Sequence, residues 1–226
     1  MRLLDLFTGV GGARKGYERA GFTVDGVDKN PQPDNAYRTI VSDVFEYAYP
    51  RLDYIRATYT MIHASSPCQH DAAITLGTNK RLRHTYPDLY APTKELLEEI
   101  GLPYVIETPK ARPDLVLCGE MFGLRVTRHR NFELGGWSTA KPTHPPHRGL
   151  TLGMRHGKLI TEANGGYYYA VYGNGGYKGT VDQWRDAMGI HWTRNRKSIA
   201  EAIPPAYTQY IGAQFTAQIA NGGIAA

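Results

Sequence analysis

The sequence predicts an α/β protein built on a mostly parallel, doubly wound sheet. Short apolar runs alternate with segments of helical spacing along residues 1–134. A glycine-rich turn follows the first apolar run, and an acidic residue ends the second. This order of strand, glycine turn, helix, strand and acid is typical of the first unit of a doubly wound sheet. The length of 226 residues fits one such domain with a small insertion.

The expected elements follow from apolar runs, helical spacing and stop signals. The predicted strands cover residues 3–7, 22–27, 38–41, 60–64, 104–106 and 131–134. The predicted helices cover residues 13–20, 91–100, 181–188 and 207–220. Gly21, Gly101 and Gly189 follow three of these helices directly, as expected of residues that end a helix.

The composition of the chain changes after residue 134. Residues 135–180 are rich in glycine and proline, with tyrosines interleaved. We expect a small, loop-rich subdomain here, inserted near the carboxyl ends of the strands. The chain is therefore divided into a main domain over residues 1–134, the insertion over 135–180, and a segment over 181–226 that returns to the main domain.

Composition excludes several classes of protein. Hydrophobic residues make up 42% of the chain, and no apolar run approaches the roughly 20 residues of a membrane span. The amino terminus leads directly into a strand, without the pattern of a signal peptide. Two cysteines cannot form a disulfide framework or, by themselves, a zinc site. We expect a reduced, cytoplasmic, monomeric enzyme that does not contact a membrane.

Positive charge is concentrated in the second half of the chain. Residues 1–119 hold 14 basic against 15 acidic residues, a net charge of −1, whereas residues 120–200 hold 12 against 5, a net charge of +7. A local excess of this kind is expected where a protein meets a polyanion such as nucleic acid. A solvated basic face without a partner is the alternative.

The first glycine-rich turn is a candidate nucleoside site. Gly9, Gly11 and Gly12 follow Phe7 and would let the backbone approach a ligand closely. Alone, such a turn could serve a dinucleotide, an adenosyl cofactor or no ligand. An acid after each of the next two strands strengthens the site, because one could accept ribose hydroxyls and the other an adenine amino group. The alternative is that these two acids cap helices.

Pro67-Cys68-Gln69 is a candidate nucleophile motif, because it follows a predicted strand where an active-site loop would begin. A thiolate is the most nucleophilic side chain near neutral pH. The alternative is a buried structural cysteine, a role that suits Cys118 better. The hypothesis that Cys68 is a nucleophile depends on its residue type and on its position after a predicted strand.

Glu107 ends the fifth predicted strand and is a candidate acid, able to hold and protonate the ring nitrogen of a pyrimidine. Arg128 and Arg130 follow in a basic cluster with Arg125 and His129. In an extended segment Arg128 and Arg130 would share a face. One could bind a base carbonyl, and the other a phosphate or the catalytic carboxylate. A solvent-facing basic turn is the alternative.

Three histidines, at positions 144, 147 and 156, raise the question of a metal. The spacing of His144 and His147 suits two ligands of one ion. The sequence shows no third ligand clustered with them, so we expect no metal site.

Together these residues resemble the DNA (cytosine-5) methyltransferase family, and within it a compact phage-type subgroup. The resemblance covers residues 2–134 and 181–215. The cofactor loop of the family matches residues 7–12, and its Pro-Cys-Gln motif matches residues 67–69. Two further motifs match in part, since Thr108 stands in place of an asparagine and Val126 in place of a glutamine.

The resemblance implies a Rossmann-like class I methyltransferase sheet with S-adenosylmethionine as methyl donor and double-stranded DNA as substrate. Cys68 would add to C6 of a cytosine flipped out of the duplex. Glu107 would engage N3, Arg130 would hold O2, and Arg128 would support Arg130. Residues 135–180 would be the target-recognition region.

The resemblance also assigns binding residues. The cofactor would be held by Phe7, Gly9, Gly11, Gly12, Asp28, Lys29, Asp43, Val44 and Pro67. DNA would be contacted by Gln69, Arg148, Arg155, Lys158, Tyr177 and Lys178.

Three other functions remain open from the sequence. An RNA cytosine methyltransferase shares the fold and the chemistry. A catalytically silent DNA-binding module would keep the fold without the reaction, and the set of Cys68, Glu107 and Arg130 argues against it. A thiol enzyme that uses a folate also exploits a Pro-Cys motif, but the glycine turn and the two acids argue against it. If the main hypothesis holds, the enzyme acts alone or as the modification half of a phage restriction-modification system.

Overall fold

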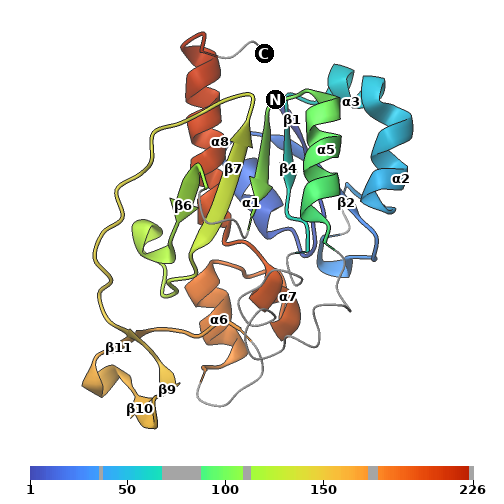
Figure 1. Cartoon of the computed structure of the whole chain (residues 1–226). Coiled ribbons are helices and arrows are strands. Elements are labelled where there is room, and N and C mark those ends of the chain that lie inside the picture. Colours follow the sequence, from blue (N-terminus) through green and yellow to red (C-terminus); the bar gives the residue numbers. More distant parts are fainter. Residues whose placement is uncertain (36–37, 68–87, 109–112, 173–177, 224–226) are drawn as a thin grey trace.

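A seven-stranded sheet forms the centre of the protein, with the strand order β3-β2-β1-β4-β5-β7-β6 (Figure 1). The computed structural model describes residues 1–35, 38–67, 88–108, 113–172 and 178–223. The strands are β1 (Arg2–Leu6), β2 (Thr23–Asp28), β3 (Thr39–Val41), β4 (Met61–Ala64), β5 (Tyr104–Glu107), β6 (Leu115–Leu117) and β7 (Arg130–Gly135). Strands β1 to β5 are parallel, and β7 is antiparallel to both of its neighbours. The predicted α/β class and mostly parallel sheet are therefore confirmed.

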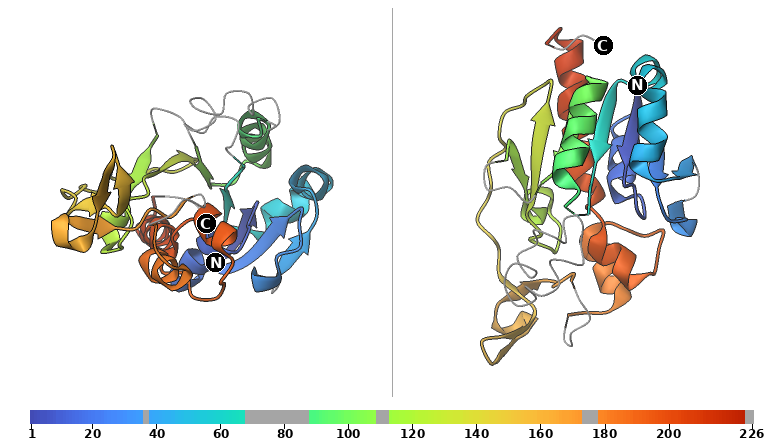
Figure 2. Two further views of the ribbon diagram at one scale, coloured as in Figure 1. Left: turned by 90° about the horizontal axis from the view of Figure 1, so that it is seen from below. Right: turned by 45° about the vertical axis from the view of Figure 1, so that its right-hand side comes forward.

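Helices cover both faces of the sheet (Figure 2). Helices α1 (Gly12–Arg19) and α8 (Pro205–Ala220) pack together on one face, in a core that includes Leu3 and Phe215. Helices α2 (Val44–Ala48), α3 (Leu52–Thr58) and α5 (Tyr90–Ile100) cover the other face, in a core that includes Leu4. Successive residues of a strand point to opposite faces, so the apolar run of β1 supplies both cores. No helix in the described ranges is long and apolar enough to cross a bilayer.

The direction of β7 decides where the following segment lies. Because β7 is antiparallel, it ends at the amino edge of the parallel strands, and residues 136–149 run back along the sheet to the carboxyl edge (Figure 1). There the chain forms two small sheets. These pair β8 (Leu150–Thr151) with β11 (Gly166–Tyr168) and β9 (Gly153–Arg155) with β10 (Lys158–Ile160). The insertion expected near the carboxyl edge therefore begins at the opposite edge and has more strand than expected.

A third apolar cluster lies below the carboxyl edge of the sheet. Helices α6 (Val181–Met188) and α7 (Arg196–Glu201) supply Trp184 and Ile199 to it, and the glycine turn supplies Val10. The indole of Trp192 donates a hydrogen bond of 2.8 Å to the Val10 carbonyl. The returning C-terminal segment is thus packed directly against the first glycine turn.

Candidate functional site

The carboxyl edge of the sheet brings together the strand ends that the sequence singled out. They are Phe7 after β1, Asp28 at the end of β2, Asp43 after β3, Pro67 after β4 and Glu107 at the end of β5. Ligands of open α/β sheets bind in the crevice outside this edge. Cys68 and Gln69, the predicted nucleophile and its neighbour, lie outside the described residues, directly after Pro67.

The glycine turn has one open position and two packed ones. Gly9 has a φ of 50°, and a Cβ there would meet nothing within 4 Å. A Cβ on Gly11 would lie 2.5 Å from the side-chain oxygen of Asn35, and a Cβ on Gly12 would lie 2.3 Å from the Ile203 carbonyl oxygen. Gly11 and Gly12 are therefore required by packing, whereas Gly9 leaves free space beside the backbone for a ligand.

Buried polar side chains that the sequence did not single out support this turn. Asn35 donates from Nδ2 to the Gly9 carbonyl (3.0 Å) and to Thr8 Oγ1 (3.3 Å), and it accepts from Arg14 Nη1 (3.1 Å). The Thr8 hydroxyl donates in turn to Asp5 Oδ2 at 2.6 Å. Burial raises the pKa of Asp5 to about 7. Nothing in the sequence marks Asn35 as a partner of the turn, because the contact depends on how the chain returns after β2.

Asp28 is held at the mouth of the turn by two backbone amides. Gly9 N donates to Oδ2 and Asn30 N donates to Oδ1, each at 2.9 Å. The carboxylate remains half-buried and therefore reachable by a ligand. Each carboxylate oxygen can accept a further hydrogen bond, so this geometry suits the ribose hydroxyls expected from the sequence. Lys29 beside it is exposed.

Asp43 caps helix α2. Its Oδ1 accepts hydrogen bonds from Phe45 N at 2.9 Å and from Glu46 N at 3.4 Å. The structure therefore contains the helix cap that the sequence offered as an alternative role for this acid. Val44, predicted beside the cofactor, is buried in the core on the α2 face, and the Phe7 ring lies edge-on to the Phe45 ring at 6.4 Å.

Glu107 and Arg130 form an ion pair at the carboxyl edge, with Arg130 Nε 2.9 Å from Glu107 Oε1. The β5–β7 ladder pairs Glu107 with Phe132, so the start of β7 lies beside the end of β5. The exposed fractions of the two side chains are 15% for Glu107 and 24% for Arg130. Arg130 is therefore the arginine that contacts the candidate catalytic carboxylate, one of the roles considered for Arg128 and Arg130.

Arg128 has different partners from Arg130. It donates from Nη1 to the Val171 carbonyl at 2.8 Å and from Nη2 to the Ala200 carbonyl. Its φ of 33° is left-handed, which breaks the alternation of an extended segment. The expectation that Arg128 and Arg130 share a face because of regular alternation is therefore wrong. In this structure Arg128 fastens the insertion to the C-terminal segment.

The predicted DNA-binding residues of the insertion differ in their exposure and in their contacts with other side chains. Arg148 donates from Nε to Glu120 Oε1 at 2.7 Å, and its guanidinium lies over the Tyr167 ring. Lys178 lies over the Tyr172 ring, with Nζ 4.2 Å from the ring centroid. Arg155 and Lys158, on β9 and β10, are exposed. Tyr177 lies outside the described residues.

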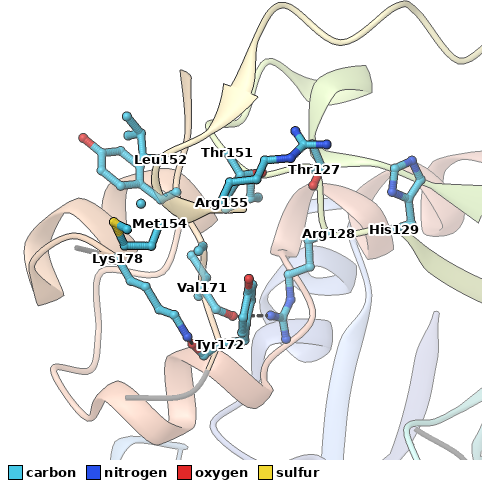
Figure 3. Close-up of a pocket in the computed structure, with 14 residues that line it drawn as sticks. Thr127, Arg128, His129, Thr151, Leu152, Met154, Arg155, Val171, Tyr172 and Lys178 are labelled. Atoms are coloured by element: carbon cyan, nitrogen blue, oxygen red, sulfur yellow. Dashed lines mark hydrogen bonds between the residues drawn. The ribbon is translucent and has the colours of Figure 1, made fainter. Parts of the chain in front are cut away.

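A pocket of about 840 Å³ opens between residues 126–129 and the insertion (Figure 3). Fourteen described residues line it, and the charged ones among them are Arg128, Arg155 and Lys178. Thr151 and Tyr172 add polar and aromatic surface. A concave surface with this charge suits an anionic chain such as a nucleic-acid backbone.

A cluster of sulfur and imidazole groups lies at the β6 end of the same edge. Cys118, His129, His144 and His147 place one ligand atom each so that all four lie within 4.8 Å of one another. The sequence predicts no metal site, because it shows no third ligand near His144 and His147. The structure supplies a third and a fourth, so this reason is wrong. His156 is not a member of the cluster.

Similarity to known proteins is confined to structure. No protein-family model and no curated protein sequence matches the chain. A provisionally assigned DNA modification methyltransferase encoded within an E. coli prophage has a TM-score of 0.65 at 13% identity, over 97% of this chain and 99% of that one.

Two Dnmt2 methyltransferases show the same likeness. A Spodoptera frugiperda DNMT2 variant has a TM-score of 0.60 at 10% identity, over 93% of this chain and 98% of that one. Dnmt2 of S. pombe has a TM-score of 0.54 at 12% identity, over 96% of this chain and 99% of that one. The chain therefore has the Rossmann-like fold of these methyltransferases.

Proposed function

We propose that this protein is an S-adenosylmethionine-dependent methyltransferase that modifies C5 of cytosine in DNA. One observation carries the proposal. The Glu107–Arg130 ion pair stands at the same sheet edge as the glycine turn, and the intervening strand β4 leads through Pro67 into Cys68. A donor site, a thiol and a carboxyl group would then surround one substrate ring.

The residues of the glycine turn fit the cofactor. S-adenosylmethionine would supply an electrophilic methyl group, which a carbon nucleophile can accept. Gly9 leaves open space beside the backbone, and Asp28, held by two amides, would accept the ribose hydroxyls. Phe7 is half-buried beside the turn and would lie against the adenosyl group. Asp43 retains Oδ2 for a further hydrogen bond to adenine while Oδ1 caps α2.

The chemistry of the substrate explains why a thiol and an acid are both needed. C5 of cytosine is a weak nucleophile until a group adds at C6. The Cys68 thiolate would form a bond to C6, while Glu107 in its protonated form donates to N3, which prevents negative charge from building up on the ring. Arg130 would orient Glu107 and bind O2. After methylation, a base would take the C5 proton, the bond between Cys68 and C6 would break to restore the thiolate, and N3 would return its proton to Glu107.

The basic surface supports DNA as the substrate. C5 and C6 are not reachable within a stacked duplex, so the target base would have to be flipped out. The pocket lined by Arg128, Arg155 and Lys178 would hold the flanking phosphates, and the insertion would read the adjacent bases.

Transfer of a labelled methyl group tests this proposal. The protein and its Cys68→Ala variant are incubated with labelled S-adenosylmethionine and either mixed duplex DNA or tRNA, and the products are digested to nucleosides. We expect labelled 5-methylcytosine from DNA with the wild type and none with the variant. Label in the tRNA arm alone would make the substrate RNA. Cofactor binding without product on either nucleic acid would indicate a silent member of the fold and reject the proposal.

A further inference from the structure

The cluster of Cys118, His129, His144 and His147 is assembled from three separate segments. Cys118 directly follows β6 and His129 directly precedes β7. The β6–β7 register pairs Leu117 with Arg130, so its continuation places Cys118 opposite His129. The other two histidines belong to the segment that returns from the far edge of the sheet. The pairing of β6 with β7 and the return of residues 136–149 along the sheet therefore bring the four side chains together.

The spacing of the ligand atoms fits a tetrahedral ion. Atoms about 2.0–2.3 Å from a common Zn²⁺ lie roughly 3.3–3.7 Å from one another. His129 Nε2 and His144 Nε2 are 3.0 Å apart, and Cys118 Sγ and His147 Nε2 are 3.4 Å apart. The remaining pairs lie within 4.8 Å, so shifts of about 1 Å would place all four around one ion.

The tautomer of one histidine is already set for binding. His144 Nδ1 lies 2.7 Å from the Pro145 carbonyl oxygen, which can only accept, so Nδ1 carries the hydrogen. The lone pair of the neutral ring is then on Nε2, the atom that faces His129. A metal-bound histidine commonly donates its other ring N–H to a backbone carbonyl in this way.

Neighbouring groups also orient His147. Its ring packs edge-on against the Tyr168 ring, with centroids 5.6 Å apart. The Tyr168 hydroxyl donates to the buried Glu120, which also accepts from Arg148. The imidazole of His147 therefore packs against a side chain that is itself held in place.

Packing alone does not account for the cluster. The three imidazoles are exposed, so their stacking removes little apolar surface from water. Residues 138–147 contain no helix or strand, yet both of their histidines meet a buried thiol at the sheet edge. Convergence of one thiol and three imidazoles on one point is what a zinc site requires.

We propose that Cys118, His129, His144 and His147 bind one Zn²⁺ ion in a four-coordinate structural site. Four protein ligands leave no open position for a substrate, so the ion would act by fastening the chain. It would hold residues 136–149 against the ends of β6 and β7 and fix His129 between Arg128 and Arg130. Binding releases the thiol proton of Cys118, since the thiolate is the ligand.

Metal content of the full-length chain, prepared without a polyhistidine tag, tests the proposal. We expect one zinc per chain in the wild type and in His191→Ala, an exposed histidine outside the cluster. Cys118→Ser and His144→Ala should lose the bound zinc. Exchange with Co²⁺ should give the absorption of a tetrahedral site with a thiolate charge-transfer band, which Cys118→Ser abolishes. Circular dichroism verifies that each variant is folded, and exposed His144 is expected to tolerate the change even if Cys118 does not.

Limited proteolysis gives a second readout that needs no methyl transfer. Removal of zinc by a chelator should make the peptide bond after Arg148 cleavable by trypsin, and added Zn²⁺ should restore protection. The proposal is overturned if the folded wild type takes up no stoichiometric Zn²⁺ or Co²⁺. It is equally overturned if His144→Ala and His129→Ala retain the full metal content, because the ion would then lie elsewhere.

Discussion

Arg130 Nε lies 2.9 Å from Glu107 Oε1, joining the start of one strand to the end of its antiparallel neighbour. A guanidinium at this distance orients the carboxyl group and leaves it at the edge where ligands of such sheets bind. Neither side chain is fully buried, so both remain available to a substrate. This pair fixes the position of the proposed acid at the sheet edge where β5 ends, next to the end of β4.

Replacement of the proposed acid should separate chemistry from binding. Glu107→Gln keeps the size of the side chain but cannot donate the proton of a carboxyl group to N3. We expect kcat to fall by roughly 10²–10⁴-fold, the usual contribution of a positioned acid. Steady-state kinetics with a duplex DNA substrate measures this, and filter binding measures affinity for DNA. An unchanged kcat in this variant would show that Glu107 is not the acid of the reaction.

The two kinds of glycine in the turn should respond differently to alanine. A Cβ on Gly12 would lie 2.3 Å from the Ile203 carbonyl, so Gly12→Ala should lower the melting temperature. A Cβ on Gly9 meets open space, so Gly9→Ala should cost only about 1 kcal/mol of backbone strain. It should nevertheless weaken cofactor binding, measured by calorimetry. Equal effects of the two changes on stability would contradict this division.

Asp43 should contribute to stability as a helix cap. Asp43→Ala removes the acceptor of two backbone amides and should lower the free energy of unfolding by about 1 kcal/mol. Urea denaturation measures the change, and Asp43→Asn, which can still cap, is the matched control. If alanine leaves stability unchanged but abolishes cofactor binding, the carboxylate serves the ligand and not the helix.

Asp5 should make stability depend on pH. Burial raises its pKa to about 7, so between about pH 4 and 7 the folded state binds the proton more tightly than the unfolded state, and stability falls as pH rises. The difference between wild type and Asp5→Asn should therefore shift by roughly 2–3 kcal/mol from about pH 5 to pH 8, against the wild type. Taking the difference cancels the opposite contribution of His63, whose pKa burial lowers to about 3. A constant difference would show that Asp5 does not titrate in this range.

Local patterns were sufficient to predict the frame of the fold. The first strand, glycine turn, helix and acid-ended strand occur as expected, because each depends on residues close in sequence. Helices α3 and α7 and strand β6 were not predicted, and α2 was raised only through the alternative that Asp43 caps a helix. These elements have between three and seven residues, which is too short for hydrophobic periodicity to stand out.

Contacts between segments far apart in the chain could not be predicted from the sequence. The meeting of Cys118 with His129 depends on the antiparallel pairing of β6 and β7, and the approach of His144 depends on the edge at which β7 ends. The role of Arg128 depends on its left-handed φ. The assignments of Asp28 and Glu107 to ligand binding stay predictions, supported by their position at one edge of the sheet.

The proposed reaction depends on a bond between Cys68 and C6 of a cytosine in DNA. Duplex DNA containing 5-fluorocytosine tests this bond, because fluorine replaces the C5 hydrogen that a base must remove, so the thiolate cannot be eliminated and the adduct accumulates. With S-adenosylmethionine present, we expect a protein–DNA species that survives denaturation. Peptide mass should map its bond to Cys68, and the species should be absent from Cys68→Ala. Methylated DNA from the wild type without any such adduct, or an adduct on another residue, would contradict the proposed reaction.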